Sequence, residues 1–149
     1  MVRIRGGAIG DLMDFQLPEI AERPAVPIQG NTISSQVARA IKLALDESLQ
    51  SRADIAARMS ERLGTPVSKT MLDAYASEGK PHTIPLDRFI ALVEVTGRRE
   101  LLGFLAERMG LIAVDKRYEA LISLQLLREH QEQIDHQRRA LELRWKASS

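Results

Sequence analysis

Apolar residues recur one helical turn apart through most of this chain, and no segment shows the two-residue alternation typical of a strand. The first such stretch holds Val37, Ile41, Leu45 and Leu49. Ser34 or Ser35 precedes it, and a serine hydroxyl can accept hydrogen bonds from the free amides of a first helical turn. The pattern therefore predicts a helix that begins near residue 34 and buries this apolar face.

Four more short helices are expected to follow. Ser51 and Ser68 are placed to cap the first two of them, and Pro85 suits the start of the third, where its missing amide costs nothing. Gly64 and Gly97 are expected to end helices. The expected apolar faces are Ile55, Ala56, Met59 and Leu63, then Met71, Leu72 and Tyr75, then Leu86, Phe89, Ile90 and Val93, and finally Leu101, Leu102, Leu105 and Met109.

A long last helix is predicted over residues 115–147, which contain neither glycine nor proline. Its apolar side carries Leu124, Leu127, Ile134, Leu141 and Trp145. Gln131 and Arg138 occupy positions where a coiled coil needs apolar residues. The apolar stripe is therefore interrupted and would make only a weak coiled-coil contact. We expect this face to pack against the body of the protein or to form a short contact between two copies. Our prediction is an isologous homodimer through residues 117–146.

Residues 1–33 hold four of the nine glycines and three of the six prolines, which predicts an extended or disordered arm. Within the arm, Leu12 and Phe15 lie three residues apart in an acidic stretch. In one interpretation they dock into the apolar groove of a host protein. In the other, which we favour, Phe15 packs on the protein's own body or on a second copy.

These patterns predict an all-α protein, a helical bundle with a helix-turn-helix core at residues 34–112. The arm 1–33 precedes the core, and the helix 115–147 follows it as a candidate dimerisation element. The length of 149 residues fits about one domain. No apolar run approaches the ~18 residues of a membrane span, and no secretory signal opens the chain, so we expect a cytoplasmic protein without a membrane partner.

Composition argues against an enzyme. The chain has no cysteine, which excludes disulfides, thiolate metal sites and a cysteine nucleophile. His130 and His136 are six residues apart on the predicted last helix, so they point to different faces and do not form a metal pair. No glycine-rich phosphate loop follows a strand. We therefore expect no catalytic residues, no metal and no cofactor.

The strongest functional pattern is a pair of helices around Pro66. Ala56 is small enough to let a second helix cross closely, and the second helix opens on the polar residues Ser68, Lys69 and Thr70. This is the arrangement of a helix-turn-helix, whose second helix enters the major groove of DNA. We predict that the DNA-binding residues are Arg52, Ser68, Lys69, Thr70, Lys80 and His82.

Net charge limits this prediction. The chain has 21 Lys and Arg against 20 Asp and Glu, whereas nucleic-acid-binding proteins are often strongly basic. Asp73 lies one turn after Lys69 and is placed to pair with it, which would weaken a DNA contact. A helical hairpin with a polar second helix is also ordinary bundle packing, so both interpretations stay open.

Residues 51–97 resemble the core of lambda-repressor-like (Cro/CI-type) DNA-binding domains. The similar features are Ile55-Ala56, a turn, a polar second helix, and Ile84-Pro85-Leu86 opening a helix that ends at Gly97. The likeness covers about a third of the chain, and residues 61–67 look longer than the family's tight turn. It implies sequence-specific binding of double-stranded DNA, usually as a dimer on a two-fold site.

Taken with the stretch Asp11-Leu12-Met13-Asp14-Phe15 near the start and with the long C-terminal helix, the whole chain also resembles small regulators of Mu-like transposable phages and prophages. The expectation is therefore a DNA-binding transcriptional regulator encoded in a phage or prophage. The alternative is a non-enzymatic protein-interaction adapter that uses the helical bundle and the apolar motif of the arm.

Overall fold

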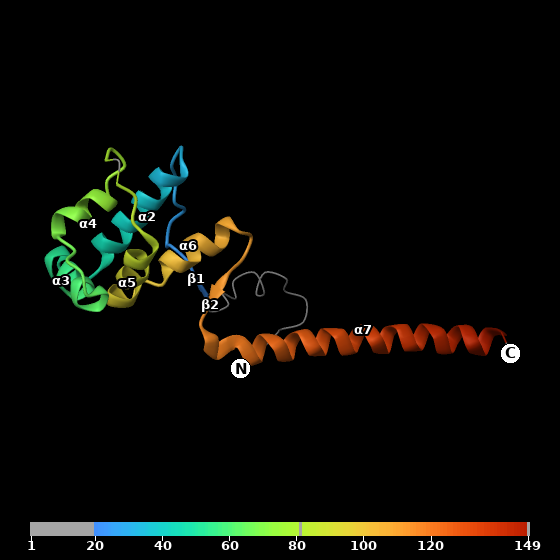
Figure 1. Cartoon of the computed structure of the whole chain (residues 1–149). Coiled ribbons are helices and arrows are strands. Elements are labelled where there is room, and N and C mark those ends of the chain that lie inside the picture. The colour runs from blue at the N-terminus through green and yellow to red at the C-terminus, as the bar shows by residue number, and fades with distance from the viewer. Residues whose placement is uncertain (1–19, 81, 149) are drawn as a thin grey trace, which may run out of the picture. The chain divides into compact units, whose positions relative to one another are not determined.

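The computed structural model describes residues 20–80 and 82–148. They divide into two compact units, of which the first ends at Ala113 and the second begins at Val114. The described residues hold six α-helices and one two-stranded sheet, so the predicted all-α class is confirmed (Figure 1). The elements in order are β1 (Ala21–Glu22), α2 (Ile33–Glu47), α3 (Arg52–Leu63), α4 (Lys69–Tyr75), α5 (Leu86–Thr96), α6 (Glu100–Arg108), β2 (Ala113–Val114), a 3-10 turn (Lys116–Tyr118) and α7 (Glu119–Ser148).

The hydrophobic core lies where the helices α2 to α6 meet. Helices α3 and α5 share the largest contact of any two elements, and α4 packs on α3 and on α2 (Figure 1). The largest side chains that are fully buried in this core are Ile41, Ile55, Met59, Leu72, Leu92 and Leu101. Each of these helices contributes apolar residues from one face, which is how short amphipathic helices gain stability that they lack alone.

The predicted starts and ends of three helices are confirmed. Ser51 Oγ accepts from the amide of Asp54 at 3.1 Å, and Ser68 Oγ accepts from the amide of Met71 at 3.1 Å. Gly64 ends α3 with φ of +70°, and Gly97 ends α5 with φ of +67°. A left-handed residue at a helix end favours glycine because it has no Cβ to clash.

The first helix differs from its prediction at both ends. Its cap is Thr32, not Ser34 or Ser35, because Thr32 Oγ1 accepts from the Ser35 amide at 3.0 Å while Ser35 Oγ accepts from the Thr32 amide at 3.2 Å. The helix also ends at Glu47. Leu49 therefore lies beyond the helix and is fully exposed, so its predicted burial is wrong.

The apolar faces of α5 and α6 agree with prediction only in part. In α5, Phe89 and Val93 are buried as predicted. Leu86 is 72% exposed and Ile90 is 50% exposed, because the helix also presents Leu92 to the core. In α6, Leu101 and Phe104 are buried. Three residues predicted to lie on its core face are exposed: Leu102, Leu105 and Met109.

The segment 20–32 is more ordered than the predicted arm. β1 pairs with β2 in a sheet that the sequence did not predict, and Ile28 packs against the core. The segment also crosses α6 at Gly103, where an added Cβ would overlap the carbonyl group of Glu22. The predicted docking residues Leu12 and Phe15 lie outside the described residues.

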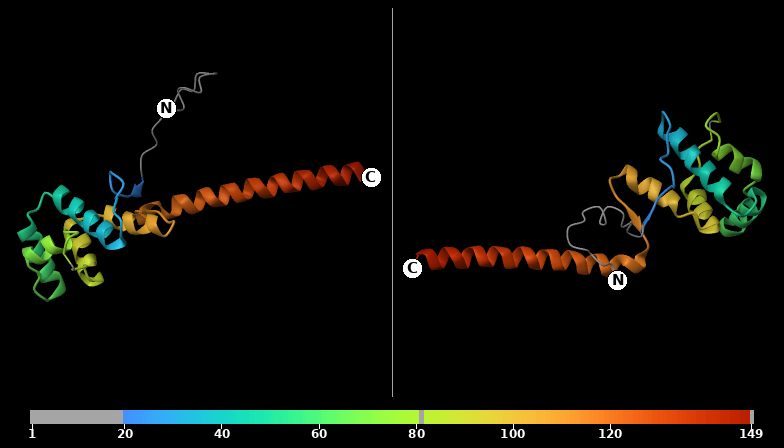
Figure 2. Two further views of the ribbon diagram at one scale, coloured as in Figure 1. Left: turned by 90° about the horizontal axis from the view of Figure 1, so that it is seen from above. Right: turned by 180° about the vertical axis from the view of Figure 1, so that it is seen from behind.

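The unit that follows is dominated by α7, one unbroken helix of 30 residues (Figure 2). It begins at Glu119, after the 3-10 turn, rather than at residue 115. None of its side chains is buried among the described residues, so the apolar stripe is not covered within this unit. Its packing on the body of the protein or on a second copy stays a prediction. No helix in the described part of the chain is long and apolar enough to cross a bilayer.

Candidate nucleic-acid interface

The turn between α3 and α4 is fixed by Ser60. Its Oγ accepts a hydrogen bond from the amide of Val67 at 2.8 Å and donates one to the Ala56 carbonyl at 2.8 Å. Val67 is itself buried, which anchors the end of the turn in the core. Because α3 extends to Leu63, the connection is the five residues 64–68, shorter than the stretch 61–67 that the sequence indicated.

The start of α4 presents three neighbouring polar residues, Ser68, Lys69 and Thr70, all of them exposed as expected. The Ser68 hydroxyl is occupied by the cap of α4. Lys69 Nζ lies 3.0 Å from Asp73 Oδ2, which confirms the pairing expected from their spacing. The Thr70 hydroxyl makes no hydrogen bond with any described residue, so it is the one side chain of the three with a free polar group.

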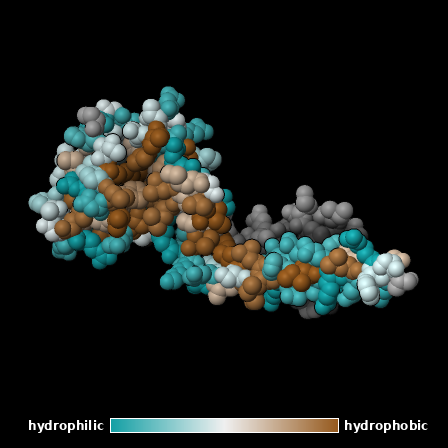
Figure 3. All heavy atoms as spheres, turned by 45° about the vertical axis from the view of Figure 1, so that its right-hand side comes forward, coloured by the Kyte–Doolittle hydropathy of each residue, from teal (hydrophilic) through white to brown (hydrophobic). Residues whose placement is uncertain are grey.

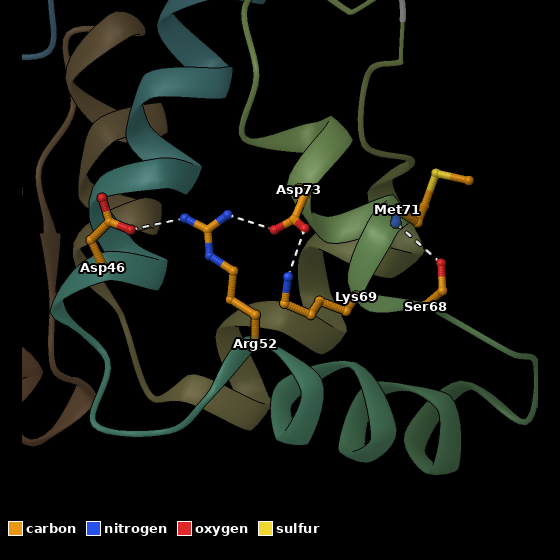
Figure 4. Close-up of polar contacts among 6 residues, drawn as sticks. All are labelled: Asp46, Arg52, Ser68, Lys69, Met71 and Asp73. Atoms are coloured by element: carbon orange, nitrogen blue, oxygen red, sulfur yellow. Dashed lines mark hydrogen bonds and ion pairs between the residues drawn. The ribbon is translucent and has the colours of Figure 1, made fainter.

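Arg52 has a different place from the one predicted. Figure 4 shows its guanidinium between two carboxylates, with Nη2 2.8 Å from Asp46 Oδ1 and Nη1 2.7 Å from Asp73 Oδ1. Its side chain is only 25% exposed. Arg52 therefore ties the end of α2 and the start of α3 to α4, and its donors are engaged within the protein. The prediction that Arg52 is a DNA contact is not supported by this position.

These contacts shift the acid–base equilibria of the Arg52–Asp73 pair. The hydrogen bond from Arg52, followed by the one from Lys69, holds the pKa of Asp73 below its ordinary value. The hydrogen bond to Asp73 raises the pKa of Arg52. The lowered pKa of Asp73 and the raised pKa of Arg52 both favour the charged forms of these side chains. The ion pair that holds α4 in place therefore persists at neutral pH.

Replacing Asp73 by asparagine should lower the free energy of unfolding at pH 7 by about 1 kcal/mol, because a partly exposed charged hydrogen bond is lost. The pKa of Asp73 is lowered by folding, so its contribution is present above the unfolded value of about 3.9 and is lost as the pH falls through the folded value. The difference between wild type and variant should therefore shrink in strong acid. Urea unfolding at pH 7 and near pH 2 measures it.

Asp54→Asn is the matched control for this change, since the Asp54 carboxylate has no side-chain partner among the described residues. It should cost no more than about 0.5 kcal/mol, the size of a charge effect at a helix start. An Asp73→Asn variant as stable as Asp54→Asn at pH 7 would show that the ion pair does not hold α4.

Lys80 and His82 lie in the loop that leaves the other end of α4, away from its exposed start. Both are exposed and border a cavity of about 30 Å³, which is large enough for a water molecule and not for a ligand. The neighbouring Tyr75 is buried, and its hydroxyl accepts from Arg88 Nη1 at 2.7 Å. The predicted DNA-binding residues therefore fall into two groups, one at each end of α4.

The unit around α4 carries almost no net charge. Residues 20–113 contain twelve Lys and Arg against eleven Asp and Glu, and seven of the twelve are ion-paired. Lys42 and Lys80 make no ion pair within the described ranges. Lys42 lies one turn before Asp46 on α2, and so on the side of α2 that faces Arg52. Every other cation without an ion pair donates a side-chain hydrogen bond within the unit. The cations available for phosphate are thus Lys42 and Lys80, together with Lys69 if its exposed ammonium leaves Asp73.

Two residues that position α4 were not identified from the sequence. Asp46 is the second carboxylate at Arg52, and Ser60 fixes the turn. A serine in the last turn of a predicted helix, shortly before a Gly-Thr-Pro break, is a signal that could have indicated Ser60. Nothing local marks Asp46, because its partner belongs to the next helix.

No group of three or more His, Asp or Glu in the described part of the chain is placed to hold a metal ion. A comparison of the chain with protein-family models, with curated proteins and with solved structures finds no match. The likeness of residues 51–97 to lambda-repressor-like domains therefore stays a prediction from the residues themselves.

Proposed function

We propose that this protein binds double-stranded DNA as a transcriptional regulator, with α4 as the helix that reads the major groove. The observation that carries the proposal is the pair α3–α4. Its turn is fixed by Ser60, its second helix is held by the Arg52–Asp73 ion pair, and the start of that helix exposes Ser68, Lys69 and Thr70. In helix-turn-helix proteins, residues at this place contact base edges.

The few available cations of residues 20–113 favour binding in which each copy of the protein contacts only a few DNA phosphates. With Lys42, Lys69 and Lys80 as the available cations, about three counterions would be released per unit, so the affinity should fall only gently with salt. Specificity would then come from hydrogen bonds at α4, where Thr70 has a free hydroxyl and Lys69 can donate to guanine.

The proposal includes a homodimer and a phage or prophage origin, both expected from the sequence. A dimer doubles the phosphate contacts and matches a two-fold site. The long exposed helix α7 is the candidate dimerisation element, because nine of its large apolar side chains are exposed.

The second candidate function is a protein-interaction adapter. The same nine exposed side chains of α7 favour it, as does the near-neutral unit formed by residues 20–113. A host protein bound through Leu12 and Phe15 belongs to this alternative.

The proposal is tested by incubating the full chain with random duplex DNA at low and moderate salt, followed by sequencing of the retained DNA. Enrichment of a motif, above all a palindrome, is the expected result. Retention without a motif, lost at moderate salt, would leave only non-specific contact and favour the adapter.

Lys69→Glu should weaken binding to the selected DNA at least ~10-fold, because a second carboxylate beside Asp73 would face phosphate at the start of α4. The fold should be retained, since Lys69 is exposed. Lys116→Glu is the matched control, as Lys116 is exposed outside the bundle. Fluorescence anisotropy gives both affinities, and equal losses in the two variants would show that α4 has no special role.

A further inference from the structure

The apolar stripe of α7 has heptad spacing. Ala120, Leu127, Ile134 and Leu141 are seven residues apart at one seam position, and Leu124, Gln131, Arg138 and Trp145 occupy the other. In Figure 3 hydrophobic surface interrupts the hydrophilic surface along α7. The apolar seam side chains from Leu124 to Trp145 are between 44% and 75% exposed. An exposed apolar stripe of this length is typical of a surface that another protein surface buries.

The polar interruptions of the stripe are joined by one carboxylate. Gln131 Nε2 donates to Asp135 Oδ1 at 3.2 Å, and Arg138 Nη2 lies 3.5 Å from the same oxygen. Arg138 Nε also lies 3.9 Å from Glu142. Both interrupting side chains are thus drawn toward the edge of the seam on which Asp135 lies, and the long stem of Arg138 can still cover apolar surface.

A parallel pairing of two copies puts like residues opposite each other. Arg138 would face Arg138 of the second copy, and Trp145 would face Trp145 of the second copy. Two guanidinium groups in one buried layer repel each other, and two indoles must share one layer. Parallel pairing is therefore disfavoured at two of the seam layers.

An antiparallel pairing matches the same residues well. When Leu124 lies opposite Leu141 of the second copy, the other layers become Leu127 with Arg138, Gln131 with Ile134, and Ala120 with Trp145. The smallest seam residue then faces the largest, and each arginine lies against an apolar side chain. Alternation of large and small residues is what fills a helix interface without voids.

Charge favours the antiparallel pairing as well. In this register Arg128, at the edge of the seam, faces Asp135 of the second copy, and the two-fold axis repeats the contact. Arg128 makes no ion pair with any described residue. The Asp135 carboxylate accepts from Gln131 and lies near Arg138 of its own helix, so it already sits at the edge of the seam. Opposite charges at such flanking positions set the choice and direction of a helical partner.

We propose that α7 is the binding surface for α7 of a second copy of this chain, in antiparallel orientation, with its two-fold axis between Glu132 and Gln133. This deepens the dimer of the proposed function and does not depend on its DNA contact. The starts of the two α7 helices would lie about 40 Å apart, at a rise of ~1.5 Å per residue.

Spin labels measure the orientation directly, because the full chain has no cysteine of its own. Gln133→Cys and Ala147→Cys both lie at exposed heptad positions away from the seam. In the antiparallel dimer the labels at 147 are about 45 Å apart and those at 133 are within ~25 Å. In a parallel dimer both pairs lie within ~25 Å. Pulsed dipolar spectroscopy should give the first result.

Charge exchange tests the register. Arg128→Glu should weaken dimerisation about 5- to 10-fold in sedimentation equilibrium, since two ion pairs become repulsive contacts. Arg139→Glu, off the seam, is the matched control and should leave the dimer unchanged. Arg128→Glu with Asp135→Lys should dimerise more tightly than either single variant.

The outcomes separate the claims. Short distances at both labels would overturn the antiparallel pairing and leave a parallel dimer. An absence of dipolar coupling in both variants, with a monomer in sedimentation, would overturn the dimer itself. The DNA selection described above decides the DNA contact independently of both results.

Discussion

Leu72→Ala should lower the free energy of unfolding by about 2–5 kcal/mol, the usual cost of a cavity left by a buried leucine. Leu72 is completely buried and is the main apolar anchor of α4, which packs through it on the neighbouring helices α2 and α3. A seven-residue helix has little stability of its own, so α4 depends on this contact. Urea unfolding followed by circular dichroism measures the loss.

Leu86→Ala makes the same chemical change at a site where the leucine is 72% exposed, and it should cost no more than about 0.5 kcal/mol. Equal losses in the two variants would mean that α4 does not pack as described. The same pair tests a correction to the sequence-based prediction, which placed Leu86 in the core.

Gly103→Ala is the second change with a large expected effect. The informative result is whether it raises or lowers the free energy of unfolding. Alanine for glycine inside a helix normally gains about 1 kcal/mol. Here the new Cβ would overlap the backbone of Glu22, which crosses α6 at this point. We expect a net loss of about 1–3 kcal/mol, the range found for overpacked sites, with release of the segment around β1.

Gly79→Ala is the control, because a Cβ at Gly79 meets nothing within 4 Å and its backbone conformation is open to alanine. Urea unfolding compares the two variants, and hydrogen exchange at the Glu22 amide reports whether the segment detaches. A Gly103→Ala protein more stable than wild type would show that the segment does not cross α6 so closely.

The sequence predicted the features of this fold that depend on neighbours in the chain. Ser51, Ser68, Gly64 and Gly97 mark helix ends through contacts within a few residues, and all four are where the pattern placed them. The pairing of Lys69 with Asp73, one turn apart, was likewise visible from spacing alone.

The errors concern contacts between distant parts of the chain. Helical periodicity shows that α5 has an apolar side but not that Ile90 lies at the edge of that side, since this depends on where α3 packs. Arg52 resembled a free cation because its partners lie 6 and 21 residues away. A basic residue beside a predicted recognition helix is therefore weak support for a nucleic-acid contact until its carboxylate neighbours are known.

The absence of any buried side chain in α7 has a thermodynamic consequence. A helix that buries nothing relies on its backbone hydrogen bonds and on local side-chain pairs such as Gln125 with Glu129, each worth a few tenths of a kcal/mol. Its population then obeys mass action: any surface that covers α7 raises its helical content by binding it. The helical content of α7 should therefore rise with the concentration of any partner that covers it, whereas the folding of the core built on α3 and α5 should not depend on concentration.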